Sequence, residues 1–309
     1  MTEQIDVSVV MSVYNGAEHL RGSVDSILSQ DGVSLELIVV NDGSTDKTPQ
    51  ILDEYAGRDS RVRIIHQENQ GLTAALVRGC STARGCYIAR QDAGDVSMPG
   101  RLSKQLGCIK ERPDASLVSC GTRFVGPADE FLYDVTRNPR GATERLLTLD
   151  PAVIEGPSSH PSTMFPRAAY ERVGGYRSAF YFGQDLDLWI RLAEQGEHII
   201  LPEMLYQAAV TVQSISGRYR REQIEITRII LESARLRRNG LSEQPALSRA
   251  ESIKPVKNRG SSRLARARAL YFIGACLKRR NDPQATIYLK EALRIYPLHL
   301  RSAVRLLFG

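Results

Sequence analysis

Short apolar runs alternate with amphipathic stretches from Val7 to Cys120, and this alternation limits the fold more than any other feature of the sequence. The apolar runs have the length and composition of buried strands, and the stretches between them have a helical period. The pattern predicts an α/β fold, a mostly parallel sheet with flanking helices. The expected strands are Val7–Val13, Leu35–Val40, Val62–His66, Cys86–Ala89 and Ser116–Cys120, and the expected helices are Glu18–Gln30, Lys47–Tyr55, Leu72–Ser81 and Arg101–Glu111.

Polar residues follow each of the first four expected strands. They are Tyr14-Asn15-Gly16, Asn41-Asp42-Gly43-Ser44, Asn69-Gln70-Gly71 and Asp92-Ala93-Gly94-Asp95. Open α/β sheets bind ligands beyond the carboxyl ends of their strands. We therefore expect these segments to meet at one edge of the sheet and to form a ligand site there.

The acidic residues of these segments have a functional and a structural interpretation. Asp42 can accept a hydrogen bond from a nucleobase, or it can be a turn residue before a helix capped by Ser44 or Asp46. Asp92 and Asp95 can hold a divalent cation, which prefers hard oxygen ligands, or they can belong to a solvated turn. Taken one at a time, these residues leave both interpretations open.

A further helix is expected to begin at Asp185 and to run through Leu188 to a stop at Gly196. Asp185 is either the N-cap of this helix or a general base that takes a proton from a hydroxyl group. Trp189, one turn later, either walls a site or packs in the core. His160 either contacts a substrate or has a structural role.

The C-terminal third differs from the rest of the chain in charge. Residues 1–216 carry 20 Lys and Arg against 28 Asp and Glu, a net charge of −8, whereas residues 217–309 carry 21 against 7, a net charge of +14. We expect a main domain over residues 1–216 and a basic helical C-terminal region over residues 217–309. That region should contain a long helix, a linker at about 240–262 and a helix pair over 264–296, which either resembles one tetratricopeptide unit or packs on the main domain.

Composition excludes several classes of protein. No apolar stretch reaches the length of about 18 residues that a transmembrane helix needs. The first residues contain acidic side chains and do not resemble a signal peptide. The five cysteines have no zinc-site spacing, which favours reduced thiols in a cytosolic protein. The basic region lacks interleaved aromatic residues, so no nucleic-acid partner is expected.

Taken together, the motifs resemble the family-2 glycosyltransferases with the GT-A fold. The similar segments are Ser8–Gly16, Val39–Asp46, Asn69–Leu72, Ala89–Asp95 with Pro99 and Arg101-Leu102, and Gln184-Asp185 through Arg191-Leu192. The resemblance covers roughly residues 6–216. The C-terminal third lies outside it.

The resemblance implies an inverting transferase that uses a nucleotide-sugar donor. Asp185 would be the catalytic base that deprotonates an acceptor hydroxyl, and Asp92 would open the Asp-x-Asp element near ribose and metal. Asp92 and Asp95 would hold Mg²⁺ or Mn²⁺, which neutralises the leaving diphosphate. The nucleotide-binding residues would be Val13, Tyr14, Asn15, Asp42, Asn69, Arg90 and Asp92, and the acceptor side would contain His160, Gln184, Trp189 and Arg191.

Three departures from the family pattern affect these expectations. Gly94 stands where the second Asp of the Asp-x-Asp element is expected, so metal binding depends on Asp92 and Asp95. Gln184 stands where a Glu usually precedes the base. The segment Tyr206–Thr211 lacks the Arg or His that often assists the leaving diphosphate.

The expected acceptor is a growing glycan or a lipid-linked precursor. The basic C-terminal region could face anionic phospholipid at the inner side of the cell membrane, grip the diphosphate of a lipid carrier, form an oligomer interface, or be a solvated surface. The alternative to a cytoplasmic enzyme is a decayed transferase that acts as a binding or scaffold module. Donor hydrolysis or transfer, lost on Asp185→Asn, distinguishes the two.

Overall fold

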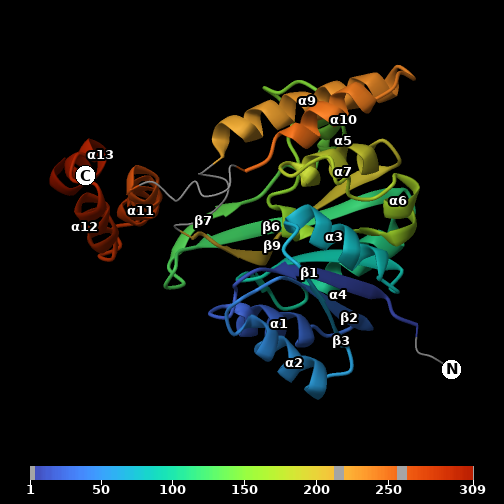
Figure 1. The fold of residues 1–309 in the computed structure, drawn as a ribbon, viewed down its shortest axis with the longest axis horizontal. Helices are drawn as coiled ribbons and strands as arrows, with labels where there is room; N and C mark the ends of the chain where they lie inside the picture. Colours follow the sequence, from blue (N-terminus) through green and yellow to red (C-terminus); the bar gives the residue numbers. More distant parts are fainter. Residues whose placement is uncertain (1–3, 212–218, 256–262, 309) are drawn as a thin grey trace.

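The computed structural model describes residues 4–211, 219–255 and 263–308. Its centre is one mixed sheet with helices on both faces (Figure 1). One half of this sheet has the order β3-β2-β1-β4, and all of its neighbours are parallel. These strands are β1 (Val7–Val13), β2 (Leu35–Asp42), β3 (Val62–Gln67) and β4 (Tyr87–Asp92).

The first four helices of the chain lie where the sequence predicts them. They are α1 (Leu20–Leu28), α2 (Thr48–Arg58), α3 (Leu72–Ser81) and α4 (Arg101–Glu111). Side chains of β1 alternate between two hydrophobic clusters: Val9 and Met11 pack with α1 and α4, and Val10 packs with α3. This two-sided burial explains the continuous apolar run of β1. The expected α/β architecture is confirmed.

Strands β2, β3 and β4 extend one to three residues further than predicted. Their polar ends remain in the parallel ladder, because Asp42 pairs with Gln67 and Asp92 pairs with Ser12. Hydropathy does not reveal these positions, since the backbone bonds of a ladder do not depend on the side chain. The extension places Asp42 and Asp92 on strand ends, where the backbone fixes their positions.

The other half of the sheet makes it mixed, and the sequence predicts only part of it. The order continues from β4 as β8-β6-β9-β5, and β7 pairs with the last residues of β6, beyond the part that pairs with β8. Strands β6 and β9 are parallel, whereas the other pairs in this half are antiparallel. The strands are β5 (Val96–Ser97), β6 (Ala115–Val125), β7 (Phe131–Val135), β8 (Thr163–Pro166) and β9 (Glu197–Ala209).

Four helical segments cover this half of the sheet: α5 (Ala142–Leu147), the 3₁₀ turn η1 (His160–Ser162), α6 (Arg167–Arg172) and α7 (Gln184–Ala193). Helix α7 begins at Gln184, one residue before the predicted start at Asp185, and ends before the expected stop at Gly196. Leu188, Ile190 and Leu192 of α7 are fully buried. The helix is therefore anchored in the core.

Helices α9 (Arg220–Arg238) and α10 (Gln244–Ser252) lie against the main body of the molecule (Figure 1). Ile226, Ile230 and Ala246 belong to the same hydrophobic cluster as Leu188 of α7. The expected linker at about 240–262 is wrong in its first half, because α10 is an ordered helix whose Ala246 and Ala250 are fully buried. The expected boundary between 216 and 217 and the linker residues 256–262 lie outside the described residues.

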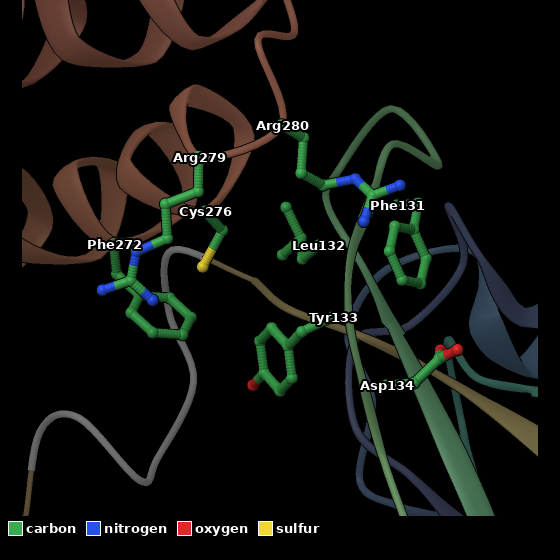
Figure 2. A pocket seen from close by; sticks show the side chains of 8 residues that line it. All are labelled: Phe131, Leu132, Tyr133, Asp134, Phe272, Cys276, Arg279 and Arg280. Atoms are coloured by element: carbon green, nitrogen blue, oxygen red, sulfur yellow. The ribbon is translucent and has the colours of Figure 1, made fainter. Parts of the chain in front are cut away.

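The expected helix pair over 264–296 is confirmed as α11 (Arg263–Lys278) and α12 (Ala285–Ile295), and α13 (Leu300–Phe308) follows it. These helices form a group at one end of the molecule, next to the β6–β7 hairpin (Figure 1). Leu132 of β7 packs in one cluster with Ile273 and Leu277 of α11 (Figure 2 shows this contact region). In the parts of the chain that the structure describes, no helix is long and apolar enough to span a bilayer.

Candidate active site

The loop after β1 is held in place by the loop after β2. The amide of Asn15 donates to Ser44 Oγ at 2.9 Å, and the amide of Thr45 donates to Asn15 Oδ1 at 2.8 Å. These bonds stabilise a left-handed backbone at Asn15, with φ of 51°. Val13 is buried at the end of β1, whereas Tyr14 is 55% exposed. The structure therefore presents the Tyr14 ring and the Asn15 backbone at the carboxyl edge of the sheet.

Asp42 braces the loop between β3 and α3. Its Oδ1 accepts from Gln67 Nε2 at 2.7 Å and from the Gln70 amide at 2.9 Å, and its Oδ2 accepts from the Gly71 amide at 2.8 Å. The residue is 3% exposed. The Asp42 carboxylate already accepts three hydrogen bonds from the protein, so a nucleobase would have to approach an occupied acceptor. Asn69, in the same loop, is exposed.

Asp92 is the open carboxylate of the acidic loop, and Arg90 positions it. The guanidinium of Arg90 is fully buried and donates to the carbonyl of Val10 at 2.9 Å and to Asp92 Oδ1. The Asp92 side chain is 39% exposed. The expected direct contact between Arg90 and the nucleotide does not fit this burial. Arg90 therefore acts on a ligand indirectly, by positioning Asp92.

Asp95 faces away from solvent and connects the acidic loop to β9. Its Oδ2 accepts from the Tyr206 hydroxyl at 2.9 Å, and its Oδ1 accepts from the Ala209 amide at 2.9 Å. Burial, together with the charge of Asp92, raises the pKa of Asp95 to about 8. A buried carboxyl whose two oxygens accept from protein donors is a poor metal ligand, so the expected role of Asp95 in metal binding does not fit the structure.

A divalent cation would therefore depend on Asp92 and on its ligand. Within the described residues, no group of three His, Cys, Asp or Glu side chains could hold a metal ion. Mg²⁺ is usually held by one or two carboxylates together with substrate phosphates. Asp92 supplies one such carboxylate, so the site fits an ion that is shared with a bound diphosphate and does not fit an ion held by protein side chains alone.

Asp185 lies in the first turn of α7, where burial raises the pKa of its carboxyl group. Its Oδ1 accepts from the Leu186 amide at 2.9 Å, a bond that favours the ionised form. The charge of Asp92 raises the pKa of Asp185 further, and that of Arg90 lowers it. Asp185 on α7 therefore interacts electrostatically with Asp92 and Arg90 at the end of β4. A carboxylate with a raised pKa is better matched to proton abstraction near neutral pH.

Arg191 and Gln184, both expected on the acceptor side, are buried. Arg191 is 4% exposed and donates to Asp187 Oδ2 at 2.5 Å and to the carbonyls of Val173 and Gly175 at 2.6 and 2.8 Å. These bonds hold the turn before α7, so Arg191 has a structural position. Gln184 is 6% exposed at the start of α7.

His160 and Trp189 form an aromatic group beneath the site. His160 Nε2 lies 2.7 Å from the Tyr176 hydroxyl, and its ring meets the Trp189 ring edge-on at 6.0 Å between centroids. Burial holds the pKa of His160 well below its usual range, so the imidazole is neutral. Trp189 is 6% exposed and packs in the hydrophobic core, as the structural interpretation predicts.

The structure adds one residue that the sequence gives no reason to select. Tyr206 is fully buried, donates to Asp95 and accepts from the amide of Asp92 at 3.1 Å. It therefore holds both ends of the acidic loop against β9. The tyrosine lies 111 residues from Asp95, and no motif connects the two positions.

A hollow of about 630 Å³ lies between β7 and α11 (Figure 2). The Arg280 guanidinium lies over the Phe131 ring at 4.1 Å, and Phe272 meets the Tyr133 ring edge-on at 5.9 Å between centroids. Among the described carboxylates, none lies within ion-pair distance of Arg279 or Arg280. The hollow therefore combines aromatic surface with cations that have no acidic partner.

This hollow adjoins the acidic loop through the last residues of β9. The amide of Ala209 bonds to Asp95, and the next residue, Val210, donates to the carbonyl of Val125 at 2.8 Å. Val210 also packs against the cluster that contains Leu132 and Tyr133. The two sites thus lie along the same edge of the sheet.

Comparison with known proteins agrees with this geometry. The family model described as Glycosyl transferase family 2 matches residues 8–174. Putative glycosyltransferase EpsE of Bacillus subtilis (strain 168) is 36% identical over 208 residues, which cover 65% of this chain and 72% of EpsE. Chondroitin synthase of Pasteurella multocida (strain Pm70) is 30% identical over 203 residues, which cover 65% of this chain and 20% of that protein.

Solved structures share the fold at low sequence identity. Mannosyltransferase PcManGT from Pyrobaculum calidifontis, in complex with GDP-Man and Mn²⁺, matches with a TM-score of 0.57 and 20% identity over 99% of this chain and 84% of PcManGT. S. aureus TarS 1–349 in complex with UDP matches with a TM-score of 0.53 and 14% identity over 97% of this chain and 91% of that chain. These likenesses show the GT-A fold.

Proposed function

This chain belongs to glycosyl transferase family 2, and on that premise we propose that it transfers a sugar from a nucleotide-sugar donor to an acceptor hydroxyl with inversion at the anomeric carbon. One observation carries the proposal. The first turn of α7 places Asp185, whose pKa is raised, within electrostatic reach of the open carboxylate of Asp92 at the end of β4. A base on one side and a donor-binding carboxylate on the other is the arrangement that a direct displacement requires.

In the proposed reaction, the Asp185 carboxylate takes the proton of the acceptor hydroxyl. The acceptor oxygen forms a bond to the anomeric carbon as the bond from that carbon to the diphosphate oxygen breaks. The nucleoside diphosphate leaves with the electron pair. The attack comes from the face opposite the leaving group, and the configuration inverts.

The donor is proposed to lie along the carboxyl ends of β1, β2 and β4. Tyr14 and Asn15 would contact the base and ribose, Asn69 and Asp42 would border them, and Asp92 would lie near the ribose and diphosphate. A divalent cation, when bound between Asp92 and the donor phosphates, would neutralise the charge of the leaving diphosphate. The complexes of PcManGT with GDP-Man and Mn²⁺ and of TarS with UDP support this class of ligand.

The acceptor is proposed to be a glycan chain or a lipid-linked sugar that reaches the site past the hollow between β7 and α11. Aromatic rings such as Tyr133 and Phe272 can stack on the apolar faces of sugar rings. Arg279 and Arg280 would attract an acidic or phosphorylated acceptor. The chondroitin synthase relative, whose name refers to a glycan product, supports a glycan acceptor.

The test begins with the donor. We expect one of UDP, GDP or dTDP to raise the melting temperature of the wild-type protein, with a larger shift in the presence of Mn²⁺, because ligands that bind the folded state stabilise it. The matching nucleotide sugar should then be consumed by the wild-type protein. Asp185→Asn should retain the nucleotide-induced shift and lose turnover by ~10²–10⁴-fold.

Two results would count against the proposal. If no nucleoside diphosphate changes the melting temperature, the donor site does not exist as described. If nucleotides bind but neither hydrolysis nor transfer occurs with any donor, and partner proteins still bind, the scaffold alternative is supported. Equal turnover in the wild type and in Asp185→Asn would show that another group is the base.

A further inference from the structure

Helix α13 exposes its apolar side to solvent. Leu300 is 75% exposed, Val304 56% and Leu307 75%, and their spacing of four and three residues places them on one face of the helix. The opposite face carries Ser302, which is fully buried. A surface helix of a globular protein normally buries its apolar face and exposes its polar one. In α13 the face with Leu300, Val304 and Leu307 is instead exposed.

The exposed apolar surface continues beyond α13. Leu298, just before the helix, is 75% exposed. Elsewhere, Val77, Val153 and Leu241 are exposed one at a time on separate elements, which is normal for a soluble domain. The four residues Leu298, Leu300, Val304 and Leu307 are therefore distinguished by their concentration, and we call them the α13 face. Contiguous apolar patches of this kind mark interaction surfaces.

Arginines from three helices lie next to the α13 face. Arg220 of α9, Arg268 of α11 and Arg301 of α13 line a hollow of about 710 Å³ together with Leu298 and Leu300. Among the residues that the structure describes, no acidic side chain lines this hollow. Residues 263–308 carry ten Lys and Arg and two acidic residues. The α13 face thus has a basic rim, formed by Arg220, Arg268 and Arg301.

We propose that the α13 face and its basic rim dock on the surface of a bilayer that contains anionic phospholipids. An amphipathic helix with apolar residues on one face and cations beside it binds in the plane of a membrane interface. The leucines would enter the boundary between headgroups and acyl chains, and the arginines would contact lipid phosphates. This inference does not depend on the transfer reaction.

Charge favours a membrane over a second copy of the chain. Two copies that met through the α13 face would bring their basic rims together, and like charges at such an interface oppose association. An anionic bilayer offers an apolar interior and negative charge at once. It also matches the asymmetry of the chain, since the acidic N-terminal part would be repelled from the same surface.

Docking through α13 would hold the acceptor edge of the sheet near the membrane. Helices α11 and α12 contact the β6–β7 hairpin through Leu132 and through a hydrogen bond from Tyr288 to Glu130. The same hairpin borders the hollow shown in Figure 2. A lipid-linked acceptor would therefore meet the site without leaving the bilayer surface.

Vesicle flotation of the full chain tests the proposal. We expect wild-type protein to float with vesicles of phosphatidylcholine that contain about a third phosphatidylglycerol, and to float less with phosphatidylcholine alone or at high salt. The double substitution Leu300→Asp/Leu307→Asp should weaken binding by about tenfold or more. Leu241→Asp, at a leucine that is 58% exposed and lies between α9 and α10, is the matched control and should bind as wild type.

A second variant separates charge from apolar insertion. Arg268→Gln/Arg301→Gln should weaken binding to anionic vesicles and reduce its salt dependence, while circular dichroism remains unchanged. The proposal is overturned if the wild type does not bind anionic vesicles or if both double variants bind as wild type. It is also overturned if light scattering shows a wild-type dimer that Leu300→Asp/Leu307→Asp dissociates, since the face would then be a contact between copies. Donor consumption with a soluble acceptor, measured in parallel, reports on the transfer reaction alone.

Discussion

Three carboxylates of this protein illustrate how burial and partners divide one residue type into different roles. Asp92 is open at the strand end, Asp95 is closed by Tyr206 and the Ala209 amide, and Asp185 is partly buried at a helix start. An open carboxylate can bind a ligand, a closed one links two segments, and a partly buried one gains proton affinity. The proposed chemistry needs the first and the third.

The raised pKa of Asp185 predicts the pH dependence of transfer. The base must be ionised, so turnover should be lost as pH falls through the pKa of Asp185, and the loss should occur above the range of an ordinary aspartate. The acidic limb of kcat/KM measures this pKa. If Asp185→Glu shifts the pH at which kcat/KM falls and keeps the donor Kd of the wild type, the measured pKa belongs to Asp185. If that pH does not change, the measured pKa belongs to another group.

Substitutions at Asp92 should separate ligand binding from support of Arg90. Asp92→Asn keeps an oxygen that can accept from the buried Arg90 guanidinium, so we expect a wild-type melting temperature and a weaker response to nucleotide and Mn²⁺. Asp92→Ala removes the acceptor and should also destabilise the fold by about 1–3 kcal/mol. Urea unfolding and nucleotide titration check both effects. Equal stability of the two variants would contradict the positioning role of Arg90.

At this scale the sequence predicts which residues cluster but not what each one does. Asp42, Asp92 and Asp95 are predictable because they follow strands whose carboxyl ends meet at one edge of the parallel sheet. The closed position of Asp95 depends on Tyr206, a partner far away in the chain. The φ of 99° at Gly94, in the left-handed region that favours glycine, is also a property of the folded loop.

Among the elements, the parallel half of the sheet was predictable and the mixed half was not. Long apolar strands separated by amphipathic helices give a strong periodic signal, as in β1 and α3. Strand β5 has two residues and is defined by its pairing with β9, so no local pattern reveals it. Helix α10 lies in a polar stretch and is stabilised by packing of two small residues, Ala246 and Ala250. Tertiary contacts decide such elements.

Helix α9 should be needed for placing the catalytic base. Ile230 is 1% exposed, and a Cβ at Gly183, just before α7, would lie 2.9 Å from its side chain. Ile230→Ala should destabilise the fold by about 2–5 kcal/mol and also lower kcat, because the cavity lies beneath the start of α7. Ile224→Ala, at an isoleucine that is 48% exposed on the same helix, is the control and should do neither. Denaturant unfolding and turnover measure both, and an unchanged kcat in a folded Ile230→Ala would refute the link.

The burial of Asp95 between the acidic loop and β9 should make stability depend on pH. The pKa of Asp95 is about 8 in the folded state and about 3.9 in an unfolded chain. The folded state then keeps a proton that the unfolded state releases, so the free energy of unfolding should fall as pH rises from about 4 to 8, by roughly 5 kcal/mol. Asp95→Asn should remove this dependence of the free energy of unfolding on pH. The substitution also changes one hydrogen bond, which shifts the free energy of unfolding by the same amount at every pH. Urea unfolding at several pH values decides, and an unchanged slope in Asp95→Asn would disprove the assignment.

At the scale of the whole molecule, the charge asymmetry of the sequence corresponds only in part to the packing. Helices α9 and α10 carry basic residues but share a core with the main body, where Arg237 pairs with Glu194 at 2.7 Å. The domain boundary at residue 216 therefore remains a prediction, since the charge of a segment does not show which hydrophobic core it packs in. The group α11–α13 instead contacts the body through β7.

The contact between β7 and α11 should couple this basic helical group to acceptor use without affecting the donor site. Leu132 is 3% exposed and packs against Ile273, Leu277 and Ala285. Leu132→Ala should weaken this contact by about 2–5 kcal/mol and speed hydrogen exchange in α11 and α12. The Kd for nucleotide should stay within about twofold of wild type, whereas transfer to a long acceptor should fall, because effects at sites without shared partners are independent.

Val153→Ala, at a valine that is 52% exposed on the main body, is the control for a shortened aliphatic side chain and should change none of these quantities. Faster exchange in α11 and α12 with unchanged transfer to a long acceptor would show that the acceptor does not use this side of the molecule. A loss of nucleotide binding in Leu132→Ala would show instead that the hairpin supports the donor site. That result would follow if the bonds from Val210 to Val125 and from Ala209 to Asp95 transmitted the disturbance along β9.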